Sequence, residues 1–99
     1  MNNGINEINI GGSYTLELFF SFEDKMLDEI FLVAYLSKKN NNYNYIIIIY
    51  KAPYEGPSED TIDTLSKLIY ANTGINPEQY RGRLVKTLQG MDQRYSSLK

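Results

Sequence analysis

Two short apolar runs, separated by a polar stretch, constrain the fold of this chain more than any other feature of its sequence. Residues 30–36 read IFLVAYL and residues 46–50 read IIIIY, and the stretch between them includes KKNNN. Both runs are rich in aromatic and β-branched residues, which favour strands, and neither alternates with polar residues. A strand alternates when one face of its sheet meets water, so these runs need cover on both faces. The second cover must come from this chain or from another molecule.

The second run is predicted to be a strand over residues 43–51. Successive side chains of a strand point to opposite faces, so both faces of this strand are apolar beyond its first three residues. We therefore expect the isoleucines to be buried on both faces. Pro53 and Pro57, which flank Gly56, predict a loop that ends the strand, because proline cannot donate to a sheet. The two expected faces are Tyr43, Tyr45, Ile47, Ile49 and Ile46, Ile48, Tyr50.

The segment around the first run, residues 22–39, has two interpretations. As a helix it would be capped by Ser21 and would end at Lys38, Lys39 and Asn40. As a strand over residues 29–37 it would follow a turn at residues 23–28. We favour the strand, because the run is short and rich in β-branched and aromatic residues. A helix would cover the second face of the sheet from within the chain, whereas a strand leaves that face to another molecule, most simply a second copy.

The remaining strand patterns lie near the N-terminus. Residues 5–10 are a weak candidate for an edge strand that ends at Gly11 and Gly12. Residues 13–22 alternate with period two, which predicts a strand with one buried face. Its apolar set is Tyr14, Leu16, Leu18, Phe20 and Phe22.

Two helices are predicted after the strands. Ser58 begins the first helix, which ends at Asn72, Thr73 and Gly74, and Asn76 with Pro77 begins the second. Gly82 and Gly90 each cost the second helix about 1 kcal/mol relative to alanine, and Gly90 is a candidate break. The apolar stripes are Ile62, Leu65, Leu68, Ile69 and Tyr80, Leu84, Leu88, Met91, Tyr95, Leu98. The expected fold is a single α+β domain over residues 1–99, an antiparallel sheet of three or four strands followed by a C-terminal αα-hairpin packed on one face.

The composition excludes several kinds of chemistry. The 99 residues include no cysteine and no histidine, so disulfides, thiolate metal sites and serine–histidine catalysis are excluded. No phosphate-binding glycine motif is present, and we expect no cofactor. Glu23, Asp24 and Lys25 partly match the two acids and a lysine of metal-dependent nucleases, but a solvated turn explains them as well, and we expect no enzyme. Glu59, Asp60 and Asp63 are explained as acids at the start of a helix.

Two candidate binding surfaces emerge. The chain has nine tyrosines, and tyrosine is enriched at protein interfaces because it joins a large apolar ring to a polar tip. Residues 64–99 are the basic part of an acidic chain, with two acids against six bases, which is a pattern that favours contact with phosphates. Ordinary packing and a solvated helix face are the competing explanations. The candidate protein interface is Tyr43, Tyr45, Tyr50 and Tyr54, and the alternative nucleic-acid surface is Arg81, Arg83, Lys86, Arg94 and Lys99.

The composition also resembles that of a loosely defined group of proteins. Ten asparagines, eleven isoleucines and nine tyrosines, without cysteine, histidine or tryptophan, are similar to the small orphan proteins of AT-rich genomes, such as those of archaeal filamentous viruses. The resemblance implies a virus-encoded protein that acts inside the host cell by binding a host or viral macromolecule. It assigns a role to no residue.

The sequence thus predicts a binding protein. No stretch approaches the roughly 20 apolar residues of a membrane span, and residues 1–12 lack the basic and apolar regions of a signal peptide, so we expect a soluble intracellular protein without a membrane partner. We expect a non-enzymatic protein-interaction or regulatory module that binds a protein through its Tyr/Ile-rich strand surface, most simply as a homodimer. A nucleic-acid-binding protein that uses the basic C-terminal helix is the alternative.

Overall fold

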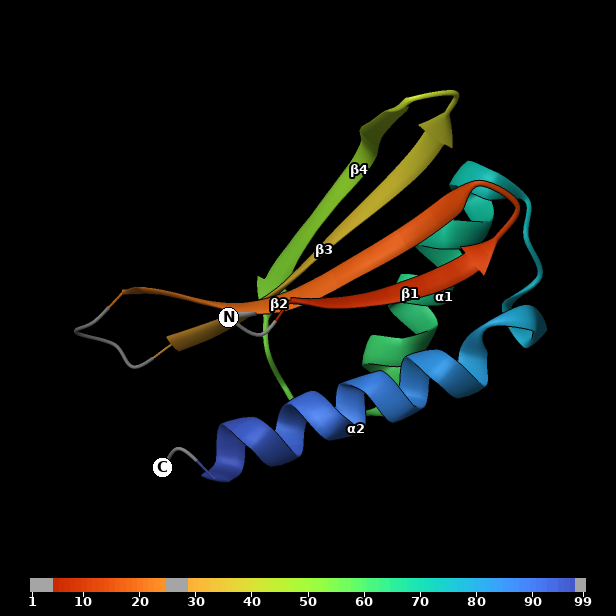
Figure 1. The fold of residues 1–99 in the computed structure, drawn as a ribbon. Helices are drawn as coiled ribbons and strands as arrows, with labels where there is room; N and C mark the ends of the chain where they lie inside the picture. Colours follow the sequence, from red (N-terminus) through yellow and green to blue (C-terminus); the bar gives the residue numbers. More distant parts are fainter. Residues whose placement is uncertain (1–4, 25–28, 98–99) are drawn as a thin grey trace.

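The fold is an antiparallel sheet followed by two helices (Figure 1). The computed structural model describes residues 5–24 and 29–97, apart from the side chains of Glu23, Asp24 and Ser97. The four strands lie in the order β1-β2-β3-β4. The expected α+β class, with an antiparallel sheet before a C-terminal αα-hairpin, is confirmed. The elements are β1 (Asn6–Gly11), β2 (Tyr14–Asp24), β3 (Glu29–Asn40), β4 (Tyr43–Pro53), α1 (Glu59–Thr73), the short 3₁₀ helix η1 (Pro77–Gln79) and α2 (Arg81–Ser97).

The first apolar run is a strand, as we favoured. β3 pairs with β2 on one side and with β4 on the other, so it lies in the interior of the sheet. β2 continues to Asp24, which pairs with Glu29, and residues 25–28 of the expected turn lie outside the described residues. Because residues 29–40 are a strand, they do not cover the sheet as a helix.

The helix boundaries follow the capping residues that the sequence contains. The Ser58 hydroxyl accepts a hydrogen bond from the backbone N–H of Thr61, and Gly74 ends α1 with φ of 73°. The Asn76 side chain caps η1, directly before α2. Gly90, the candidate break, does not interrupt α2, which continues through it. The buried Leu88 and Met91 on either side anchor the helix to the core and offset the weak propensity of glycine.

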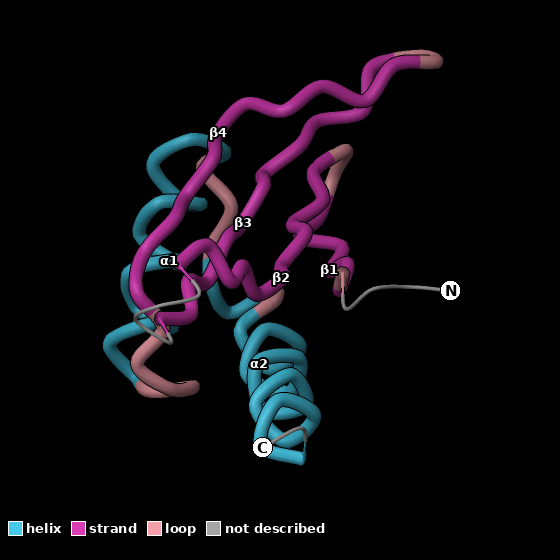
Figure 2. The backbone as a smooth tube through the Cα atoms, turned by 90° about the vertical axis from the view of Figure 1, so that its left-hand side faces the viewer, coloured by secondary structure: helices cyan, strands magenta, loops and turns pink. Residues whose placement is uncertain are grey.

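The helices cover one face of the sheet, as Figure 2 shows from the side. The core between them is apolar and tightly buried, and the one buried tyrosine hydroxyl in it, on Tyr80, donates to the backbone oxygen of Ser66. The residues of this core are Ile8, Ile10, Leu16, Leu18, Leu32, Ala34, Leu36, Ile62, Leu65, Ile69, Tyr80, Leu84, Leu88 and Met91.

The side chains of β4 depart from the expected alternation. Leu36 of β3 pairs with Ile48 while the next residue, Ser37, pairs with Ile46, so Ile47 is the extra residue of a β-bulge. The two faces exchange at the bulge. Tyr43 and Tyr45 therefore lie on the helix side with Ile48 and Tyr50, and Ile46 shares the opposite face with Ile49.

The expected burial of β4 on both faces is also wrong. Ile46 is 50% exposed, Ile47 38% and Ile49 64%. β4 is the edge strand, and its hairpin with β3 extends past both helices (Figures 1 and 2). Ile46, Ile47 and Ile49 thus lack full cover from the described part of the chain, whereas Ile48 packs against the core.

Candidate interaction surface

The face of the sheet that points away from the helices carries a patch of large apolar side chains. Leu18 and Ala34 pair on the helix side, so Phe19 and Val33, which pair next to them, lie on the opposite side. The same register, continued across β3 and β4, brings further apolar residues to that side. We call this side of the sheet the open face, and its apolar residues are Phe19, Phe31, Val33, Tyr35, Ile46 and Ile49.

The apolar residues of the open face support one another. The rings of Phe19 and Tyr35 meet edge to face, with centroids 5.3 Å apart. Val33 is only 5% exposed, although it lies on the face that no helix covers. Ile49, in contrast, remains 64% exposed. The open face is therefore packed within itself and still presents apolar surface to solvent.

Charged side chains stand at two margins of the open face. Glu7 and Glu17 are directly opposite each other on β1 and β2, an arrangement of like charges that destabilises a strand pair. Among the described residues, no cation lies within salt-bridge distance of either carboxylate. Lys51 stands on β4, with its ammonium 5.0 Å from the centroid of the Phe31 ring. The open face thus has an acidic margin on β1 and β2 and a basic margin on β4.

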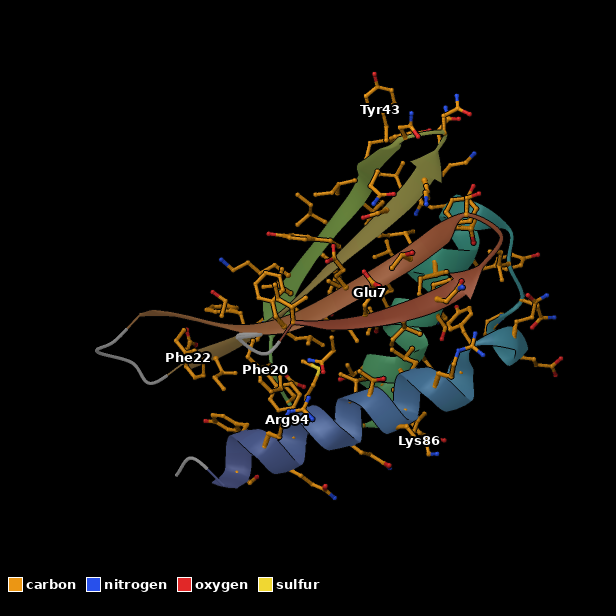
Figure 3. The ribbon with its side chains drawn as sticks, viewed as in Figure 1. Glu7, Phe20, Phe22, Tyr43, Lys86 and Arg94 are labelled. Atoms are coloured by element: carbon orange, nitrogen blue, oxygen red, sulfur yellow. The ribbon has the colours of Figure 1, made fainter. Side chains whose placement is uncertain are left out.

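Side chains of α2 contact the β1 edge of the sheet, whereas the β4 edge is exposed. Along β1, the Arg83 guanidinium donates to the backbone oxygen of Asn9 at 2.7 Å, and Arg94 donates to the side-chain oxygen of Asn6 at 2.8 Å. Figure 3 shows Arg94 reaching from α2 toward the sheet. No strand lies beyond β4 in the described part of the chain. Because an exposed apolar edge strand is a template for further pairing, β4 extends the interaction surface of the open face.

The four tyrosines that the sequence singled out do not form one surface. Tyr43 and Tyr45 are 73% and 43% exposed at the projecting end of the β3–β4 hairpin, where Figure 3 labels Tyr43. Tyr50 and Tyr54 instead pack against the core on the helix side. Only the first two are therefore open to a partner.

The apolar residues of the open face were not selected from the sequence as an interface. Phe19 interrupts the otherwise polar set of Thr15, Glu17 and Ser21, and this interruption is the signal that marked an apolar outer face. Phe31 and Tyr35 lie in a continuous apolar run, which has no alternation to tell their face from the core face. Only the pairing register of the strands shows that these two residues lie on the open face.

Tyr54 holds the loop after β4 against α2. Its hydroxyl donates to a carboxylate oxygen of Asp92 at 2.5 Å, and its ring lies 4.6 Å from the ring of Phe20. Burial and the neighbouring carboxylate both disfavour the phenolate, so they raise the pKa of Tyr54 well above its ordinary value. A cavity of about 470 Å³ beside it is lined in part by Glu29 and Tyr95. Because the ring of Tyr54 packs on that of Phe20, we assign the hydrogen bond between Tyr54 and Asp92 a structural role.

The basic residues of α2 are largely engaged within the protein. Arg81 forms an ion pair with Asp63 of α1 at 3.0 Å, and Arg83 and Arg94 hold β1 as described above. Lys86 is exposed on α2, near Glu7 of β1. Lys99 lies outside the described residues. These contacts divide the cations between α1 and the β1 edge, and the nucleic-acid hypothesis stays a prediction.

The described residues contain no cluster of acidic side chains suited to a metal ion. The side chains of Glu23 and Asp24, and the whole of Lys25, lie outside the described residues, so the nuclease-like pattern stays a hypothesis. Glu59 and Asp60 stand exposed in the first turn of α1, where negative charge stabilises the helix. Neither α1 nor α2, as far as they are described, is long and apolar enough to cross a membrane.

Comparison of the chain with protein-family models, with curated proteins and with solved structures finds no match. Function is therefore inferred from the geometry of the chain itself.

Proposed function

We propose that the protein is a non-enzymatic interaction module that binds a protein partner through the open face and the adjoining β4 strand, and that it acts as a homodimer. The observation that carries the proposal is the exposure of Ile46 and Ile49, together on a sheet face that the described chain leaves uncovered. Exposed clusters of large apolar residues with a charged rim are typical of protein interfaces.

The area of the open face is consistent with a role as a protein interface. Four strands about 4.8 Å apart, with about ten residues rising about 3.3 Å each, present a face of roughly 600 Å². Stable protein interfaces begin at about 600 Å² per partner, so the open face reaches the lower end of that range. The rings of Phe19 and Tyr35 are already packed together, which lowers the entropic cost of ordering them on binding.

Site-specific photocross-linking tests the proposal. A photoreactive amino acid at position 49, on the open face, is compared with one at position 64, which is exposed on α1. Any protein captured at position 49, whether a second copy or another chain, is purified and titrated against the wild type and Ile49→Glu. We expect Ile49→Glu to weaken binding about tenfold or more, because it buries a charge in the interface.

Thr64→Glu is the matched control, since it adds the same charge to the helix side of the molecule, and it should leave the affinity unchanged. Capture at position 49 that does not exceed capture at position 64 would contradict the proposal. So would a captured protein whose affinity is the same for Ile49→Glu as for the wild type.

A further inference from the structure

Resting on the proposed function, we infer that two copies of the chain pack open face to open face about a two-fold axis parallel to the strands, with the acidic margin of each copy against the basic margin of the other. The partner is thus a second copy, and its orientation is set by charge.

Residues on the open face form rows across the strands. In one row, Glu7 on β1 pairs with Glu17 on β2, Glu17 with Tyr35 on β3, and Tyr35 with Ile49 on β4. In the next row Val33 of β3 pairs with Lys51 of β4. Along a strand these rows are about 7 Å apart. Within these two rows, charge therefore changes sign across the sheet, from two carboxylates on β1 and β2 to an ammonium on β4.

Two-fold packing of such a face has two aligned solutions, and charge separates them. An axis parallel to the strands places β1 of one copy over β4 of the other, so that Glu7 lies over Ile49 and within one row of Lys51 of the second copy. An axis across the strands places β1 over β1, so the acidic margin of one copy then lies over the acidic margin of the other. Sheets pack about 10 Å apart, within the combined reach of a glutamate and a lysine, so the parallel axis is favoured.

The acidic margin supports a cationic partner on its own. Lys86 of α2 lies near Glu7, but no cation among the described residues is within salt-bridge distance of Glu7 or Glu17. In the proposed packing, Lys51 from the second copy supplies that cation, and the contact occurs twice because the interface is symmetric. One surface that carries both an apolar centre and both signs of charge is complementary to itself.

A charge-exchange experiment tests this pairing with purified protein. The variants are Glu7→Lys, Lys51→Glu and the double variant, all at exposed positions, and the dimer dissociation constant of each is measured by sedimentation equilibrium at low salt. We expect each single variant to weaken the dimer about tenfold or more, because each creates two like-charge contacts across the interface. The double variant should restore the dimer. An equimolar mixture of the two single variants should also restore it, as a heterodimer.

Circular dichroism of each variant separates loss of pairing from loss of folding, and recovery in the mixture cannot arise from either variant alone. The inference is overturned if Glu7→Lys dimerises like the wild type, as expected for pairing of β4 edges, which lie away from Glu7. Weakening without recovery in the mixture also overturns it. If the wild type remains monomeric at 100 µM while position 49 captures another protein, binding of a protein partner through the open face survives, whereas the homodimer and the packing inferred from it fail. If position 49 captures nothing, both fail.

Discussion

At the scale of single residues, the contact between Tyr54 and Asp92 shows how one hydrogen bond joins distant parts of the chain. The two residues are 38 positions apart, and the bond fixes the loop that leaves the sheet against the last helix. Burial of the Tyr54 hydroxyl and the nearby carboxylate raise its pKa. The unfolded chain therefore releases this proton first as the pH rises above about 10.

We expect Tyr54→Phe to be about 1 kcal/mol less stable than the wild type at pH 7, because Asp92 loses its donor. Above pH 10 the difference should shrink. There the wild type binds one more proton at Tyr54 when folded than when unfolded, so its free energy of unfolding falls with pH, whereas the variant has no such group. Urea denaturation from pH 7 to pH 11 measures both effects. Tyr43→Phe, at the exposed hairpin tip, is the control, and equal slopes for the wild type and Tyr54→Phe would contradict this account.

At the scale of elements, two glycines have opposite roles in the helices. Gly74 ends α1 with φ of 73°, and its N–H bonds to the backbone oxygen of Tyr70. Gly90 lies within α2, where an added Cβ would meet a guanidinium nitrogen of Arg94 at 3.5 Å, an ordinary contact. The first glycine is required by backbone conformation, and the second is not.

The same substitution should therefore have opposite effects at the two positions. We expect Gly74→Ala to lower the free energy of unfolding by about 1 kcal/mol, because a side chain is disfavoured at positive φ. We expect Gly90→Ala to raise it by about 1 kcal/mol, because alanine has the higher helix propensity. Chemical denaturation at one protein concentration measures both. Two changes of the same sign would contradict either the left-handed conformation of Gly74 or the continuity of α2 through Gly90.

At the scale of the whole molecule, the number of helices that pack on the sheet decides which of its faces stays exposed. Two helices, each about 10 Å wide, span about the width of a four-stranded sheet. Both α1 and α2 lie on the same face, and the described residues have no further α-helix for the other. Ile46 and Ile49 are exposed for that reason, and the β3–β4 hairpin extends the exposed surface past the helices.

If a second copy covers the open face, thermal stability depends on protein concentration. We expect the midpoint of thermal unfolding to rise by about 5 °C for a hundredfold increase in concentration, because pairing stabilises only the folded chain. Calorimetry over that range measures the shift. Ile49→Glu should remove the dependence, and Thr64→Glu should retain it. A wild-type midpoint that does not change with concentration would contradict self-association.

Much of the fold could be predicted from local pattern. Ser58, Gly74 and Asn76 mark helix ends by hydrogen bonds that involve only near neighbours, so the sequence suffices to place them. The strand at residues 29–40 was favoured by its β-branched and aromatic content, although its apolar run also fits a helix. The candidate tyrosine interface could not be predicted as well from the sequence. Tyr50 and Tyr54 pack against the core through contacts with residues far away in the chain, and no local pattern indicates those contacts.

Local sequence pattern was enough to predict the order of the elements and most of their types, since alternation, capping residues and turn residues act over a few positions. Tertiary structure alone decided which face each side chain of β4 meets, because the bulge at Ile47 appears only when β4 is paired with β3. It also decided that both helices cover one face, which leaves Ile46 and Ile49 exposed and places Glu7 and Lys51 at opposite margins. These are relations between residues far apart in the chain, and no local pattern encodes them.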